Sequence, residues 1–262
     1  GNVTRERIML NHKRYFYRRN HKPLPDFSAY LPELRRMMDE GRYEEADKFF
    51  MDKVRESGYG STSSGEFQPG FDLDIRRQPS SPFTGYGRTL NFETGEAGVF
   101  WKEGETSYSR SLFVSRADNV VVLQMSANGK NKISGDVSLA PHDFMDAFTK
   151  SLLVSPDKLE LDFEKPVIDP QGFISLSGRR KDDGTIFGAV VRIVPTNGSM
   201  KVDKMRTKEV LSIEGADQVL VLIHLFYQGS PEEQFEVSKR MLTSLPADYE
   251  SLLKKHAVLH NV

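Results

Sequence analysis

The residues best suited to chemistry gather in one stretch near the amino terminus. Residues 11–22 read NHKRYFYRRNHK, where seven of the twelve are basic or histidine and three are aromatic. Basic side chains interleaved with aromatic rings suit phosphate contacts with base stacking. The same residues suit sugar recognition, in which rings stack on the sugar and Arg or Asn holds its hydroxyl groups. A solvated connector is the third interpretation. The candidate glycan-facing residues of this stretch are Asn11, His12, Arg14, Tyr15, Tyr17 and Arg18.

The single tryptophan, Trp101, is the other candidate for sugar contact. It follows Phe100 in a run that alternates like a strand. An exposed indole on a sheet can stack on a sugar ring, whereas tryptophan is more often buried in the core. Both interpretations of Trp101 stay open at this point.

Recognisable catalytic and metal-binding motifs are missing from the sequence. There is no cysteine, no GxSxG elbow and no GxxxxGK[ST] phosphate loop. His256 and His260 are four residues apart on a predicted helix, but Ala257 stands where a zinc protease needs Glu. The many carboxylates include no pair in a local pattern typical of glycoside hydrolysis. We therefore predict no catalytic residue, no metal site and no cofactor in this chain.

The charge balance argues against nucleic acid as a partner. Lys and Arg number 36 and Asp and Glu 37, giving a formal net charge of −1, so a global basic field is absent. The longest apolar run, VLVLIHLF at 219–226, is too short to span a bilayer. The sequence thus predicts neither nucleic-acid binding nor membrane insertion.

The pattern of short alternating runs predicts a mainly β protein. Residues 28–56 show helical spacing, with Ser28 as a plausible N-cap and Gly41 as a break between two helices. Further helices are predicted at 231–242 and 246–258. Asp183-Gly184 marks a hairpin turn. Candidate strands are 71–76, 86–92, 97–102, 105–114, 119–127, 132–139, 159–164, 172–179, 185–194, 199–203, 207–213 and 217–227. This series indicates a β-sandwich.

A collinear series of segments resembles the N-terminal domain of family 95 glycoside hydrolases, the α-L-fucosidase and α-L-galactosidase family. Each segment is a weak match alone, and their shared order makes the series specific. The segments are RERIMLN at 5–11, YLPELRRMMDEGRYEEADKFF at 30–50, FQPGFDLDI at 67–75, YGRTLNFETGEAGVFWKEGETSYSRSLFVSRADNVVVLQMSA at 86–127, ISLSGRRKDDGTIFGAVVRIVPTNGSM at 174–200, LSIEGADQVLVLI at 211–223 and ADYESLLKKHAVLH at 247–260.

The resemblance implies a fold and a division of the chain. The expected fold is a galactose-mutarotase-like super-sandwich of two antiparallel sheets, with an N-terminal helical hairpin and C-terminal linker helices. The sandwich domain would comprise residues 1–229, with the hairpin inserted at about 28–56. Residues 230–262 would form a helical linker toward a catalytic domain that this chain lacks.

The resemblance also implies a function for the parent protein. In the family, an (α/α)6 barrel follows this domain and carries the catalytic acid and the water-activating residues. The chain would then be a non-catalytic domain that packs on the barrel and shapes its active site, in a secreted or periplasmic enzyme of bacterial polysaccharide degradation. After Leu10 and Asn11, family members read EDTLWSGGP, whereas this chain reads HKRYFYRRNHK, so its loop is rewritten.

Other functions stay open beside this one. The chain could be a stand-alone carbohydrate-binding module that uses Trp101, Tyr15 and Tyr17 as stacking platforms. It could also be a structural domain without its own ligand, since function resides in sites and not in folds. The expected partners are a glycan, bound through the parent enzyme, and a helical barrel in the same chain. An exposed inter-domain face would in addition permit self-association.

Overall fold

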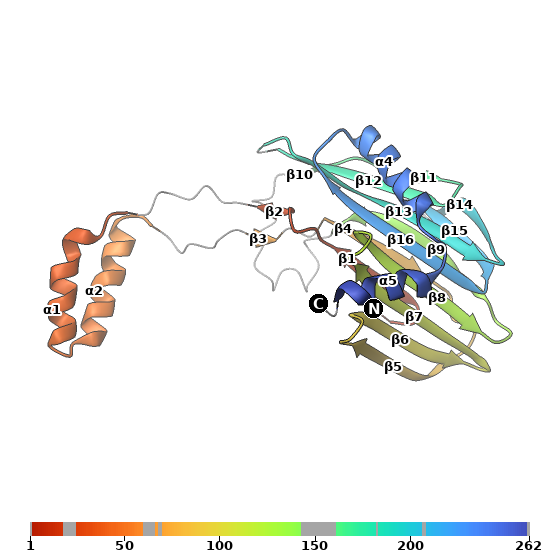
Figure 1. Ribbon diagram of the computed structural model, residues 1–262, viewed down its shortest axis with the longest axis horizontal. Coiled ribbons are helices and arrows are strands. Elements are labelled where there is room, and N and C mark those ends of the chain that lie inside the picture. The colour runs from red at the N-terminus through yellow and green to blue at the C-terminus, as the bar shows by residue number, and fades with distance from the viewer. Residues whose placement is uncertain are drawn as a thin grey trace. The chain divides into compact units, whose positions relative to one another are not determined.

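The computed structural model describes residues 2–17, 25–59, 66–67, 70–142, 161–181, 183–205 and 208–260. The chain forms two compact units: Gly1–Tyr15 with Pro69–Val262, and Phe16–Gln68. The first unit holds two antiparallel sheets and the second holds a helical hairpin (Figure 1). The mainly β sandwich predicted from the sequence is confirmed.

The described strands of the first unit build one smaller and one larger sheet. The five-stranded sheet has the order β1 (Arg5–Leu10), β4 (Phe71–Arg76), β9 (Ile133–Pro141), β15 (Lys208–Ala216) and β14 (Ser199–Met205). The nine-stranded sheet has the order β10 (Leu161–Phe163), β12 (Phe173–Arg180), β13 (Ile186–Thr196), β16 (Gln218–Tyr227), β8 (Val120–Asn128), β7 (Thr106–Ser115), β6 (Glu96–Glu103) and β5 (Phe83–Asn91), and β11 (Val167–Asp169) also pairs with β12.

The main core lies between the facing surfaces of the two sheets. Strand β4 shows why these residues form the core. Phe71, Leu73 and Ile75 alternate with charged residues, and all three are buried. They pack with residues of the larger sheet such as Leu176 and Val191. Alternation with a period of two therefore places the apolar face of β4 in the core and its charged side chains, of which Asp72 is buried, on the outer face of the sheet.

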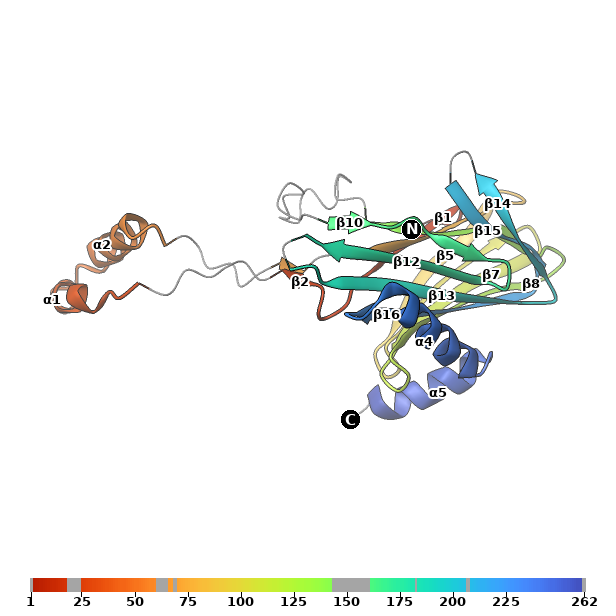
Figure 2. The same cartoon turned by 90° about the horizontal axis from the view of Figure 1, so that it is seen from above.

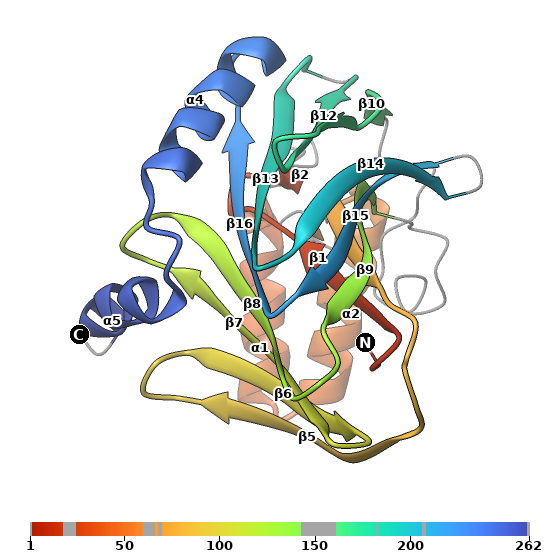
Figure 3. The same cartoon turned by 90° about the vertical axis from the view of Figure 1, so that its right-hand side faces the viewer.

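A second core lies on the outer face of the nine-stranded sheet. Helices α4 (Pro231–Ser244) and α5 (Tyr249–His260) pack there, α4 beside β13 and β16 and α5 beside β7 and β8 (Figures 2 and 3). Leu222 of β16 points to the helices while Val221 points to the other sheet. Burial on both faces explains the unbroken apolar run at 219–226. The predicted linker helices thus belong to the compact sandwich unit.

The second unit contains a helical hairpin and a short ladder. Its elements are β2 (Phe16–Tyr17), the 3₁₀ turn η1 (Ser28–Tyr30), α1 (Leu31–Asp39), α2 (Tyr43–Glu56) and β3 (Glu66–Phe67), with β2 paired to β3. Gly41 has φ +77°, and its N–H donates to the Met38 carbonyl at 3.0 Å while Arg42 N–H donates to Met37 at 2.9 Å. These two bonds form a Schellman motif, which confirms the predicted break at Gly41.

The predicted N-cap of this hairpin is wrong. The Ser28 N–H donates to Asp26 Oδ1 at 2.8 Å, and the N-cap residue of α1 is Tyr30, whose side chain forms no capping bond. A single turn of 3₁₀ helix precedes α1, so the carboxylate of Asp26 satisfies an amide at the start of that turn in place of the Ser28 hydroxyl. None of the helices among the described residues has both the length and the apolar character needed to cross a membrane.

Candidate functional site

Residues Asn11 to Tyr15 form a compact turn directly after β1. The Asn11 side chain accepts the His12 N–H at 2.8 Å, His12 Nδ1 accepts the Arg14 N–H at 3.2 Å, and Tyr15 N–H donates to the His12 carbonyl at 2.8 Å. Asn11 and Arg14 are exposed and His12 is half-buried. Burial, together with the positive charges of Arg14 and Lys13, lowers the pKa of His12. The turn therefore presents a neutral imidazole between exposed polar groups.

Tyr15 anchors this turn in the core. Its side chain is 4% exposed, and its hydroxyl lies 2.9 Å from the Gly188 carbonyl and 3.0 Å from the Phe226 carbonyl. Burial raises its pKa strongly, against the weaker effect of its bond to Gly188. Since the ring is enclosed, Tyr15 is a core residue and not a stacking platform in this structure. Arg18 and the side chain of Tyr17 lie outside the described residues.

Trp101 is also buried, in a separate cluster of aromatic and charged side chains. Its indole is 3% exposed and stacks on Tyr108 with ring centroids 5.4 Å apart. The guanidinium of Arg110 lies 4.7 Å from the indole centroid, and that of Arg77 lies 4.4 Å from the Tyr108 centroid. This arrangement leaves no indole face open to a sugar, so the core interpretation of Trp101 applies.

Glu103 completes the Trp101 cluster and carries its strongest electrostatic interactions. Its buried carboxylate forms an ion pair with Arg77, accepts the indole N–H of Trp101 at 2.9 Å and accepts the Ser80 N–H at 2.9 Å. Burial opposes the charge, but these donors prevail and hold the pKa of Glu103 at about 2. A carboxylate held ionised and fully bonded in this way stabilises the fold, and it is not placed as an acid or base.

A groove of apolar side chains opens beside β1, with Asn11 and His12 in its lining. It has a volume of about 340 Å³. Met9 and Val114 remain 39% and 60% exposed within it. The other lining residues come from β1, from β7, β8 and β16 of the larger sheet, and from the turn before β8: Ile8, Leu10, Leu112, Asn119, Val120, Val121, Ile223 and Leu225. The rewritten turn thus borders an uncovered apolar surface.

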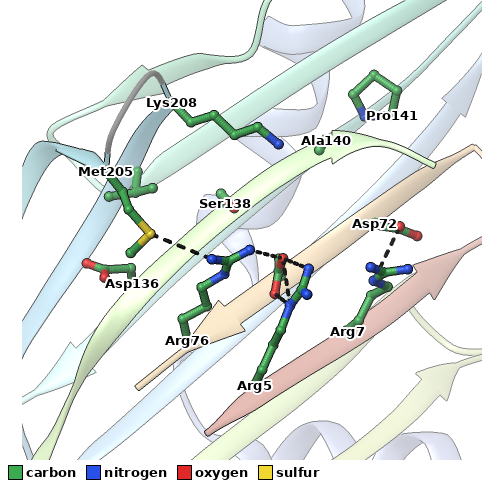
Figure 4. A pocket seen from close by; sticks show the side chains of 12 residues that line it. Arg5, Arg7, Asp72, Arg76, Asp136, Ser138, Ala140, Pro141, Met205 and Lys208 are labelled. Carbon is green, nitrogen blue, oxygen red and sulfur yellow. Dashed lines mark hydrogen bonds and ion pairs between the residues drawn. The ribbon is translucent and has the colours of Figure 1, made fainter. Parts of the chain in front are cut away.

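A second, charged groove of about 500 Å³ lies on the outer face of the five-stranded sheet (Figure 4). Strand β9 runs between β4 and β15 and contributes the small residues Ser138 and Ala140 there. Flanking strands contribute long charged side chains, so the face is hollow along β9. The lining is Arg5, Arg7, Asp72, Asp74, Arg76, Asp136, Ser138, Ala140, Pro141, Met205, Lys208 and Val210.

Ion pairs fix the carboxylates of this charged groove. Asp74 accepts from Arg5 at 2.9 and 2.6 Å and from Arg76 at 3.3 Å, and these bonds lower its pKa although burial opposes them. Asp72 lies 2.8 Å from Nδ1 of the buried His142 and 3.7 Å from Nε of Arg7. This site is not apparent in the sequence, because its members come from strands far apart in the chain. The alternation of charged with apolar residues in RERIML and FDLDIR was the available signal.

The histidine pair on α5 does not form a metal site. The rings of His256 and His260 are 5.2 Å apart, but His256 Nδ1 accepts the Arg116 N–H at 3.1 Å and His260 Nε2 donates to the Phe92 carbonyl at 3.2 Å. Among the described residues no group of three or more potential ligands could hold a metal ion. Both imidazoles instead form hydrogen bonds that connect α5 to the larger sheet, one of them at the β5–β6 turn.

The sandwich, the inserted hairpin and the covering helices define the chain as an N-terminal domain of a carbohydrate-active enzyme when they are set beside known proteins. The family model that matches residues 1–226 is described as "Glycosyl hydrolase family 65, N-terminal domain". The chain belongs to this family. The predicted class, an N-terminal sandwich domain of a glycoside hydrolase, is confirmed, whereas family 95 stays a prediction.

Two individual proteins are similar to this chain. "Alpha-L-fucosidase 2" of Arabidopsis thaliana is 27% identical over 206 residues, which are 74% of this chain and 23% of that protein. The chain thus spans about a quarter of the length of this curated relative. A solved structure titled "Putative kojibiose phosphorylase from human microbiome" aligns with a TM-score of 0.46 and 12% identity, over 74% of this chain and 28% of that one.

Proposed function

We propose that the chain is the non-catalytic N-terminal domain of an α-L-fucosidase-like glycoside hydrolase. The observation that carries this is the family match over residues 1–226, joined by the 27% identical relative named as an α-L-fucosidase. In the described residues, Glu103, Asp72 and Asp74 are each bonded to neighbouring cations, which suits a structural domain. The parent reaction would be inverting hydrolysis of an α-L-fucoside or α-L-galactoside, in a secreted or periplasmic protein.

The apolar groove beside β1 supports a role in packing on a helical barrel in the same polypeptide. Met9 and Val114 expose aliphatic surface there, and burying such surface contributes about 25 cal/mol per Å². Asn11 and His12 line the same groove, so a domain seated on it would bring the rewritten turn close to that domain. Inverting chemistry needs two carboxyl groups that hold a water between them, and both would come from the barrel.

The test compares two valine substitutions in the complete protein that contains this chain. Val114 and Val167 are each 60% exposed, but only Val114 lines the apolar groove. We expect Val114→Asp to lower hydrolysis of an aryl α-L-fucoside and to lower the thermal midpoint, while Val167→Asp changes neither. Equal effects of the two substitutions would contradict docking at this groove. Hydrolysis by the 262-residue chain alone would contradict the non-catalytic assignment.

A carbohydrate-binding module without a barrel is the second candidate. The burial of Trp101 and Tyr15 removes two of the three aromatic platforms that this function was expected to use, and the side chain of the third, Tyr17, lies outside the described residues. Among the described residues, polar groups that could bind a ligand converge in the charged groove of the five-stranded sheet.

A further inference from the structure

The charged groove on the five-stranded sheet is suited to a ligand of definite charge. Its volume of about 500 Å³ falls within the range of about 300–1,000 Å³ that is typical of small-molecule sites. None of its lining residues is aromatic, so it offers no stacking surface for the face of a neutral sugar. Four basic side chains and three carboxylates line it, which leaves an excess of positive charge.

The acceptors of this groove are already used by the protein. Asp74 is held by Arg5 and Arg76, and Asp72 is held by His142. The third carboxylate, Asp136, accepts the hydroxyl of Ser212. A ligand rich in donors would have to displace these bonds. A ligand that supplies acceptors would not.

Two cations retain donors that a ligand could use. Lys208 forms no ion pair with any residue in the described part of the chain, and its side chain extends into the hollow (Figure 4). One amino group of Arg76 donates to Asp74 at 3.3 Å, and the other contacts, among the described residues, only the Met205 sulfur at 3.9 Å. A thioether is a weak acceptor, so this second N–H group is poorly satisfied. Arg76 lies opposite Asp136 of β9, and the Lys208 side chain lies near Ala140, so the two cations approach the hollow from the two strands that flank β9.

We propose that this groove binds an acidic oligosaccharide, whose carboxylate or sulfate groups are held by Arg76 and Lys208. The planar guanidinium fork matches the geometry of both anions, and the lysine adds a point charge. The Ser138 hydroxyl at the floor of the groove forms a hydrogen bond with a sugar hydroxyl. The anion site follows from the groove itself, whereas the choice of a sugar as its carrier rests on the proposed function.

Calorimetric titration of the 262-residue chain tests this inference. The probes are a tetragalacturonate, whose only charged groups are carboxylates, a carrageenan tetrasaccharide, whose only charged groups are sulfates, and the neutral maltotetraose as control. We expect one of the two anionic probes to bind and the neutral one not to, and the preferred probe identifies uronate or sulfate as the group. Affinity should fall as salt rises, because the contacts are exposed and screened. Absence of binding by both anionic probes at 10 mM, or tighter binding of maltotetraose, would overturn the inference.

Substitutions locate the site. Lys208→Gln and Arg76→Gln should each weaken binding about tenfold, the scale of a lost charge-assisted hydrogen bond. Lys130→Gln and Arg55→Gln make the same changes of charge at exposed positions outside the groove and should leave affinity unchanged. Circular dichroism confirms that each variant is folded. Equal affinities of the groove and control variants would overturn the assignment, even if the complete protein hydrolyses fucosides as proposed.

Discussion

Replacement of Glu103 by glutamine is the sharpest test of how the sandwich is stabilised. The carboxylate is fully buried with Arg77, Ser80 and Trp101, and its pKa lies at about 2 instead of the ordinary 4.5. This difference corresponds to about 3 kcal/mol of stability at neutral pH. Glu103→Gln keeps the volume but removes the charge and leaves the Arg77 guanidinium without its anion. We expect unfolding to require about 3 kcal/mol less at pH 7, and the thermal midpoint to fall by about 6–12 °C.

The effect should depend on pH in a defined direction. Because the folded pKa lies below the ordinary value, the contribution is complete above about pH 5. It is lost as pH falls from 4.5 toward 2, since both states then bind the proton. The gap in stability between the wild-type chain and Glu103→Gln should therefore be widest at neutral pH and should narrow toward pH 3.

The fluorescence of Trp101 provides the assay. It is the only tryptophan of the chain, and its indole N–H donates to Glu103 at 2.9 Å. Urea unfolding followed by tryptophan fluorescence reports on the sandwich unit, because the helical hairpin has no tryptophan. Glu105→Gln is the control, as the Glu105 side chain is 81% exposed and pairs with Lys130 at 3.3 Å. Equal midpoints of Glu103→Gln and the wild type at pH 7 would show that the charge of Glu103 does not stabilise the fold. A gap that stays constant down to pH 3 would show that packing, and not charge, is responsible.

Two further substitutions test the packing of the larger sheet and of α5. A Cβ at Gly188 would lie 2.1 Å from Cζ of the buried Phe226 and 2.9 Å from the Leu176 carbonyl. Gly188→Ala should therefore lower the free energy of unfolding in urea by about 1–3 kcal/mol. An unchanged midpoint would mean that the Phe226 ring can move aside. Burial, together with the charges of His260 and Arg116, lowers the pKa of His256 below 6.5; stability should therefore be complete above about pH 6.5 and decline below it. His256→Gln should flatten this decline between pH 7 and 5, and a persistent slope would place the titration elsewhere.

The sheet strands were predictable because their side chains alternate and their turns carry distinctive residues. The strand expected at 97–102 is observed as Glu96–Glu103, and the hairpin expected at Asp183-Gly184 has Gly184 at φ +71°. Strands β2, β3 and β11 have only two or three residues each, too few to show a period. The outer-face packing of α4 and α5 was missed because amphipathic spacing shows that a helix has an apolar face without showing what covers it.

The sites were harder to predict because they depend on pairings between distant residues. The sequence leaves Trp101 open between surface and core and offers Tyr15 as a stacking platform. The partners that enclose them, Tyr108 for Trp101 and Phe187 for Tyr15, become neighbours only through strand pairing and sheet packing. Arg5 and Asp74 are 69 positions apart and meet only because β1 pairs with β4. The sequence shows which residues are aromatic or charged, and strand pairing decides which of them meet and which face solvent.

The place where the hairpin leaves the sandwich has a consequence for how the gene can be rearranged. Gly70 N–H donates to the Leu10 carbonyl at 3.0 Å, and a Cβ at Gly70 would lie 2.6 Å from the ring of Tyr15. The chain therefore exits and re-enters the sandwich at adjacent points, and the cost of closing the intervening segment grows only slowly with its length, by about 0.6 kcal/mol per doubling. We therefore expect that residues 16–68 can be shortened or replaced while the register of β1 on β4 is kept.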